Sequence, residues 1–206
     1  SILAAAILQQ LFLQPPAFSA GPFPLEPVVA DFNHGGKNDV ALGHAHIFGS
    51  VSVLVGDGNA GFLYQSWAVS GVIAITQIAV GDLQGDGNLD VLVASSNPSG
   101  TFALVPGDGN AGFTTPTVKV FGVLNYARAV AAGDLNGNGS DEALVGVTGN
   151  LLNGLSIYSG ASLTQTGGIG ITQEIHRLAV EDLNLDGKLD VVMLHTGSST
   201  AKLATA

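Results

Sequence analysis

The sequence predicts an all-β protein, a β-propeller of about four blades with four antiparallel strands in each. Three observations indicate this fold: a repeat of about 50 residues, short apolar runs broken by Gly, Asn and Asp, and no helical i, i+3, i+4 spacing of apolar residues. The repeats are in register, since Asp31, Asp82, Asp134 and Asp182 lie 51, 52 and 48 residues apart. Four strands in about 50 residues match the size of a propeller blade.

Each repeat follows one plan of strands and turns. An apolar strand runs into an acidic loop, and a second strand follows at 39–43, 90–94, 142–146 and 190–194. A third strand enters a hairpin, most clearly where Gly-Asp-Gly-Asn-Ala-Gly-Phe occurs at 56–62 and 107–113. Asp-Gly-Asn supplies the positive φ angles of a tight hairpin, and a more polar fourth strand completes the unit.

The repeats make residues 27–206 one propeller domain, preceded by an extended arm of residues 1–26. The four repeats span about 27–75, 76–127, 128–175 and 176–206. The fourth ends about one strand short, and an unpaired strand edge invites association. We expect the arm to supply this strand, either to its own last blade or to the last blade of a neighbouring chain. Five of the eight prolines lie between Pro15 and Pro27, so the arm is extended rather than helical.

The composition excludes several classes of function. The net charge is −10, and the six Lys and Arg residues form no cluster along the sequence, which excludes nucleic-acid binding. The absence of Cys excludes disulfides and thiol chemistry. The uncharged run 2–13 resembles a signal-peptide core but has no basic leader, and it is too short to span a bilayer. We therefore interpret it as a structural segment.

Acidic residues concentrate in four nine-residue loops, at 31–39, 82–90, 134–142 and 182–190, which hold eleven of the 16 Asp and Glu residues. Oxygen-bearing side chains occupy loop positions 1, 3 and 5, Gly occupies position 6, and an acid occupies position 9. Calcium takes six to eight hard oxygen ligands, and a loop wound around a Gly directs alternate side chains to one centre. The candidate ligands, with position 7 offering its backbone carbonyl, are Asp31, Asn33, Asp39, Asp82, Gln84, Asp86, Asn88, Asp90, Asp134, Asn136, Asn138, Ser140, Glu142, Asp182, Asn184, Asp186, Lys188 and Asp190.

These loops are not EF-hands, because their twelfth positions carry no Glu and strands rather than helices flank them. The alternative to a metal site is an Asp/Asn/Gly-rich turn without metal. Four copies in register favour the metal, so we expect three to four Ca²⁺ ions, one per loop. The first loop is the weakest candidate, since Gly35 replaces the ligand at position 5.

The sequence resembles the FG-GAP/VCBS repeat family, which includes the propeller of integrin α-subunits. The resemblance rests on Asp-Leu-Asn-Leu-Asp-Gly-Lys-Leu-Asp at 182–190 and on the two hairpin sequences, and it covers about residues 27–206. It implies calcium-binding loops within propeller blades and an extracellular location. Family propellers usually have seven blades, whereas this chain has material for about four. Either the ring is small and closed, or several chains combine to complete a larger one.

No arrangement of Ser, His and Asp or of paired carboxylates indicates catalysis, so we expect no enzyme activity. The sequence predicts an extracellular or cell-surface protein with a structural, self-assembling role, as in a filament, sheath or surface layer. Its expected partners are copies of itself, bound through the arm. The first alternative is a carbohydrate-binding or adhesion module, with glycans as partners, and the second is a polysaccharide-active enzyme.

Overall fold

The computed structural model describes residues 17–25, 27–59, 61–122, 124–149, 153–195 and 202–204. These residues form an all-β structure of four antiparallel sheets, each a simple meander of consecutive strands. Three sheets have four strands and the last has three. Within these ranges, no helix has the length and apolar character needed to cross a bilayer.

The strands of each sheet follow the repeat predicted from the sequence. The first sheet contains β1 (Val28–Ala30), β2 (Asp39–His44), β3 (Ser50–Gly56) and β4 (Phe62–Ala68), and the second contains β5 (Ile75–Gly81), β6 (Asp90–Ser95), β7 (Thr101–Val105) and β8 (Thr117–Val120). The third contains β9 (Asn125–Gly133), β10 (Glu142–Gly149), β11 (Gly154–Ser159) and β12 (Thr164–Gly170), and the fourth contains β13 (Ile175–Glu181), β14 (Asp190–His195) and β15 (Lys202–Ala204). Each acidic loop therefore joins the first and second strands of its sheet.

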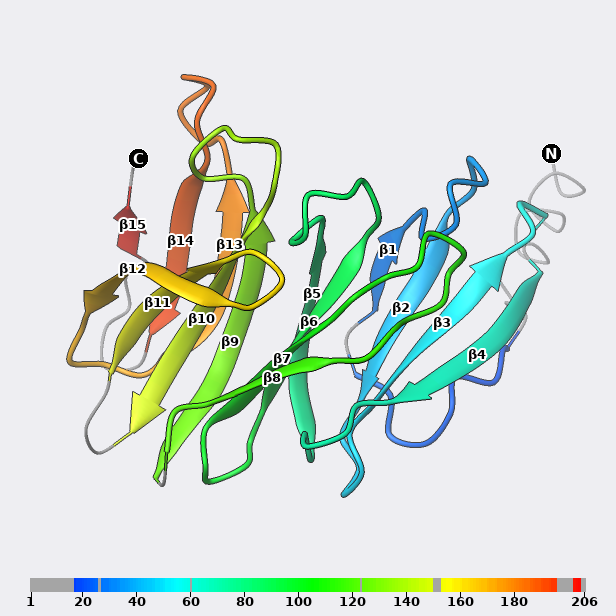
Figure 1. Ribbon diagram of the computed structural model, residues 1–206, viewed down its shortest axis with the longest axis horizontal. Coiled ribbons are helices and arrows are strands. Elements are labelled where there is room, and N and C mark those ends of the chain that lie inside the picture. The colour runs from blue at the N-terminus through cyan, green and yellow to red at the C-terminus, as the bar shows by residue number, and fades with distance from the viewer. Residues whose placement is uncertain are drawn as a thin grey trace, which may run out of the picture.

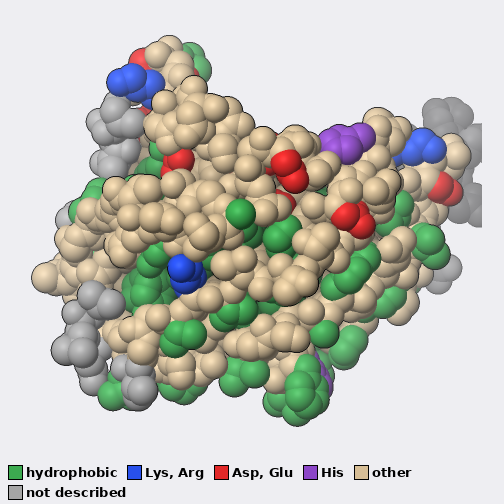
Figure 2. Space-filling view, viewed as in Figure 1, with side chains coloured by type: hydrophobic (Ala, Val, Ile, Leu, Met, Phe, Trp, Pro, Cys, Tyr) green, Lys and Arg blue, Asp and Glu red, His purple; other side chains and the backbone are tan. Residues whose placement is uncertain are grey.

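The four sheets stand side by side in chain order, like successive blades of a propeller, and no sheet closes on itself (Figure 1). The first and fourth sheets lie at opposite ends of the row. The fold is thus propeller-like, but the described residues form an open arc. Charged side chains are sparse on the face seen in Figure 2, as the composition leads one to expect.

The apolar core lies between neighbouring sheets. Three clusters of buried side chains join the first sheet to the second, the second to the third, and the third to the fourth. Glycines on the second strands allow close approach: a Cβ on Gly43 would lie 2.7 Å from Ile78, and a Cβ on Gly146 would lie 2.9 Å from Ile175. Burial of each large apolar side chain contributes roughly 1.5–3 kcal/mol, so these interfaces fix the row of sheets.

The first strands of the second, third and fourth sheets each contain a β-bulge where they pair with the second strand of their sheet. The register shifts between Ile75 and Gln77 in β5, between Ala127 and Ala129 in β9, and between Ile175 and Arg177 in β13. A bulge inserts one residue that the partner strand does not match, and it redirects that side chain. The extra residues are Thr76, Arg128 and His176.

The described part of the arm lies on the first sheet. Pro24 forms an antiparallel bridge with His44, and the carbonyl oxygen of Pro22 lies 2.8 Å from Nδ1 of that histidine. The ring of Phe18 packs edge-on against Phe62 of β4, 5.0 Å between centroids. The sequence predicted that the arm, residues 1–26, donates a strand to the last blade, but residues 17–25 contact the first sheet instead. Residues 1–16 and 26 lie outside the described residues, so the predicted strand is not seen in the described part of the chain.

Candidate metal centres

The four acidic loops lie along one edge of the arc, at the top of the view in Figure 1. They share one backbone conformation, with left-handed residues at positions 4 and 6. Position 4 has φ of 55° at His34, 70° at Gly85, 74° at Gly137 and 61° at Leu185, and position 6 has φ of 70–86° at Gly36, Gly87, Gly139 and Gly187. Because a left-handed residue other than Gly is strained, the recurrence of this conformation at His34 and Leu185 shows that the rest of the loop imposes it.

The aspartate at position 1 organises each loop. In all four loops one of its carboxylate oxygens accepts the N–H of position 6 at 2.7–2.9 Å, and the other accepts the N–H of position 5 at 3.0–3.2 Å. Hydrogen bonds from backbone N–H groups, led by that of Gly139, hold the pKa of Asp134 below its usual value. The Asp134 carboxylate is therefore ionised at neutral pH, as a calcium ligand must be.

The acid at position 9 is buried. Asp39, Asp90, Glu142 and Asp190 are at most 3% exposed, and each accepts the N–H of loop position 2 at 3.0–3.1 Å. In the first two sheets the same carboxylate also accepts an N–H from beyond the second strand, from Gly56 at 2.8 Å and from Gly107 at 2.9 Å. In these two sheets the acid therefore joins the loop, the second strand and the end of the third strand.

Burial and neighbouring charge act together on two of these acids. Burial, with the nearby carboxylate of Asp86 acting in the same direction, raises the pKa of Asp90 to about 6. Burial also raises the pKa of Glu142, with Asp134 acting in the same direction. Carboxylates of one loop are thus close enough to repel each other, and a divalent cation would relieve that repulsion.

The remaining candidate ligands lie at the surface of the loops. The oxygens of Asp86, Asn138 and Asp186 at position 5 accept the N–H of position 7 at 2.8–2.9 Å. At position 3, Asn33 and Asn184 accept the N–H of position 5. The other two position-3 residues, Gln84 and Asn136, are bonded to the acid at position 9, Gln84 through its backbone N–H and Asn136 through its side chain.

The chemistry of the candidate ligands suits calcium, which prefers oxygen ligands. Every residue at positions 1, 3, 5 and 9 has an oxygen in its side chain, except Gly35. No group of three or more His, Asp or Glu side chains in the described chain is arranged to hold a metal ion. A calcium ion would therefore need the amide oxygens of Asn and Gln and backbone carbonyl oxygens beside the carboxylates. Position 7 would contribute only its carbonyl, which accommodates Lys188.

Side chains that the ligand pattern did not single out connect neighbouring loops. Nε2 of His34 in the first loop lies 3.2 Å from Oδ1 of Asn88 in the second. Asp141 of the third loop accepts the N–H of Asp82 at 2.9 Å, and its own N–H donates to the Asp82 carbonyl at 2.8 Å. Burial raises the pKa of Asp141, with the charge of Asp82 among the causes. The first three loops thus form one continuous row.

The hairpins after the third strands carry a related carboxylate. Asp57 accepts the N–H groups of Asn59 and Gly61 at 2.7 and 2.9 Å, and Asp108 accepts those of Asn110 and Gly112 at 2.8 and 2.9 Å. These bonds close the Gly-Asp-Gly-Asn-Ala-Gly-Phe hairpins. The Nζ of Lys37 donates to the Asp57 carbonyl at 2.6 Å, so the first hairpin is also tied to the first acidic loop.

Comparison with protein families identifies the repeat. The model of the FG-GAP-like repeat matches residues 31–93 and 82–145, which together span more than half of the chain. Each match begins at position 1 of an acidic loop and extends past the next loop. The chain therefore belongs to the FG-GAP-like repeat family, as its sequence predicted.

Comparison with solved structures supports the propeller-like arrangement. A crystal structure of BBS1N in complex with ARL6DN, soaked with lead, matches with a TM-score of 0.56 and 10% sequence identity over 91% of this chain. This chain spans 58% of the length of that one, and at this identity the match concerns the fold alone. No curated protein matches the sequence.

The different surroundings of positions 5 and 9 predict different effects of substitution in calcium-free protein. Asp90→Ala removes a buried acceptor of three backbone N–H groups and should lower the free energy of unfolding by roughly 3 kcal/mol. Asp86→Ala removes an exposed carboxylate and should change it by less than about 0.5 kcal/mol. Urea unfolding of both variants after chelation measures the difference, and equal effects would contradict the structural role of position 9.

Proposed function

We propose that this chain is a calcium-binding β-propeller domain of an extracellular or cell-surface protein, with a structural, self-assembling role. The observation that carries the calcium proposal is the recurrence of one loop conformation in four sheets, with oxygen-bearing side chains at the same positions. The first loop, which has Gly35 at position 5, would bind most weakly. Four bound ions would change the formal charge from −10 to −2.

The metal would act on stability rather than on a reaction. Acidic residues of one loop repel each other in the folded chain, and neutralising them would favour the closed loop. Since each loop joins the first two strands of a sheet, tightening the loops would stabilise the sheets themselves. FG-GAP-like repeats are typical of extracellular and surface proteins, where calcium is abundant, which supports the proposed location.

Assembly is supported by the open arc and by the low charge of the chain, 11% of residues. Among the described strands, β15 pairs with β14 on one side only. Exposed apolar side chains occur at the other end of the row, where Val29 is 58% and Leu63 is 64% exposed. A strand donated by the N-terminal arm, residues 1–26, within the chain or between chains, would cover the edge of the last sheet. Donation between chains is heterologous and can propagate into a fibre.

Calcium should raise the thermal stability of the protein. At a free concentration 100-fold above the dissociation constant, each independent site would add about 2.7 kcal/mol to the free energy of unfolding. Differential scanning calorimetry in calcium and in excess EGTA measures the effect, with Mg²⁺ as the control ion. In a variant carrying Asp86→Ala and Asp186→Ala, calcium should raise the melting temperature much less than it does in the parent protein. Identical melting temperatures with and without calcium would contradict the proposal.

Deleting residues 1–13 tests assembly while it keeps the segment from Phe18 to Leu25 that contacts the first sheet. We expect the truncated chain to keep its β-sheet circular dichroism and to lose polymers or dimers that the full chain forms. Light scattering coupled to size exclusion measures the mass of both proteins. A truncated chain with the same folding and the same assembly state would show that the arm donates no strand.

A further inference from the structure

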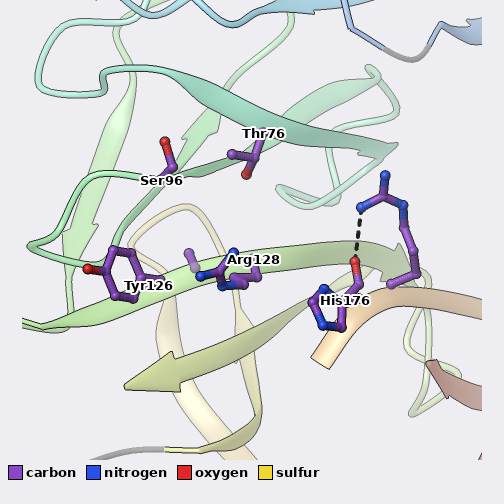
Figure 3. A pocket seen from close by; sticks show the side chains of 7 residues that line it. Thr76, Ser96, Tyr126, Arg128 and His176 are labelled. Carbon is purple, nitrogen blue, oxygen red and sulfur yellow. Dashed lines mark hydrogen bonds between the residues drawn. The ribbon is translucent and has the colours of Figure 1, made fainter. Parts of the chain in front are cut away.

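A pocket of about 180 Å³ opens among the first strands of the second, third and fourth sheets. Its lining residues are Thr76, Ser96, Tyr126, Ala127, Arg128, His176 and Arg177. Figure 3 shows Thr76 and Ser96 across from Tyr126 and Arg128, with His176 of β13 to the right of Arg128. A second cavity of about 370 Å³ shares Tyr126 and Arg128 with the first, so the two form one hollow along β9. An enclosed apolar cavity of about 150 Å³ admits benzene, so this hollow has room for a small molecule.

The pocket is built from equivalent positions of three successive repeats. Thr76, Arg128 and His176 each lie six residues before the first aspartate of their acidic loop. Each is also the extra residue of the bulge in its strand. Bulges redirect side chains and recur beside functional sites. Here three bulges direct three different polar side chains into one place.

The pocket gathers positive charge in a chain that has little. Arg128 and Arg177 are two of only six Lys and Arg residues in a protein of net charge −10, and no Asp or Glu lines the pocket. Glu174 lines the adjoining cavity, and its carboxylate lies 3.9 Å from Nε2 of His176. The two arginines are 49 residues apart in sequence and line the same pocket because β9 and β13 are neighbours.

Arg128 is held in place by a contact that preserves its charge. The guanidinium carbon of Arg128 lies 5.3 Å from the centroid of the Tyr126 ring, and the structure records no hydrogen bond or ion pair of Arg128 with the described residues. Nη1 of Arg177 donates to the carbonyl of His176 at 3.0 Å. A guanidinium offers five N–H donors in a planar fork, the geometry that matches a carboxylate, sulfate or phosphate.

Hydroxyl groups without partners complete the lining. Oγ1 of Thr76 in the pocket and Oγ1 of Thr148 in the adjoining cavity are buried, and neither has a hydrogen-bond partner in the described chain. Leaving a buried polar group unpaired is unfavourable, so a ligand oxygen in the hollow would gain from both hydroxyls.

We propose that this pocket binds a small ligand bearing one oxyanionic group, with Arg128 and Arg177 holding the anion and Thr76 donating a hydrogen bond. The tyrosine ring and the adjoining cavity would accept the uncharged part of the ligand. This site lies among the first strands and uses none of the calcium-loop residues, so it does not depend on the proposed metal.

Isothermal titration of the full chain tests the site with three probes: D-glucuronate, inorganic sulfate and D-glucose. We expect glucuronate to bind and neutral glucose not to bind. Sulfate binding as well would define a general oxyanion site, and glucuronate alone a carboxylate site. Binding of neither anion, or equal binding of glucose and glucuronate, would overturn the proposal.

Matched variants locate the binding. Arg128→Gln and Arg177→Gln should each weaken glucuronate binding by about tenfold or more, because each removes a charge-assisted contact. Lys119→Gln on β8 removes the same charge outside the pocket and should leave binding unchanged. Both arginines are exposed, so these variants should retain the melting temperature of the parent. Unchanged binding in both arginine variants, or the same loss in Lys119→Gln, would place the anion elsewhere.

Discussion

The buried acid at the last position of each acidic loop is the interaction on which the rest of the structure depends. A buried carboxylate is tolerated only when hydrogen bonds satisfy it, and here backbone N–H groups do so. Asp90 binds the start of its own loop and the segment beyond β7, so three parts of the second sheet meet at one side chain. Without this link, the first strand would lose its fixed position between neighbouring sheets.

This link separates two roles within each loop. Position 9 is directed into the protein and holds the strands, while positions 1, 3 and 5 remain near the surface with oxygens suited to calcium. The loop conformation is set by backbone hydrogen bonds to position 1, which explains how Leu185 adopts φ of 61° although it is 88% exposed and gains nothing from packing. β9 lies beside both β5 and β13, and residues at the bulges of these three strands line the pocket proposed to bind an oxyanion.

The sequence predicted the strands and loops well because both are encoded locally. The second strand expected at 90–94 is observed as Asp90–Ser95, and the hairpin at 56–62 joins β3 to β4. The bulges could not be predicted, since a shift of one residue in register is decided by packing between sheets. For the same reason, neither the contact of Asp141 with Asp82 nor the presence of Arg128 and Arg177 in one pocket could be predicted from the sequence. The number of repeats in the sequence also does not determine whether the four sheets close into a ring or remain an open arc.

Hydrogen exchange at loop position 2 tests most directly whether the buried acids hold the loops. The relevant amides are those of Phe32, Leu83, Leu135 and Leu183, each bonded to the acid at position 9. In calcium-free protein we expect them to exchange at least about a hundredfold more slowly than unstructured amides, which corresponds to about 2.8 kcal/mol for local opening. Unprotected exchange at these four amides, with the strands still protected, would contradict the account.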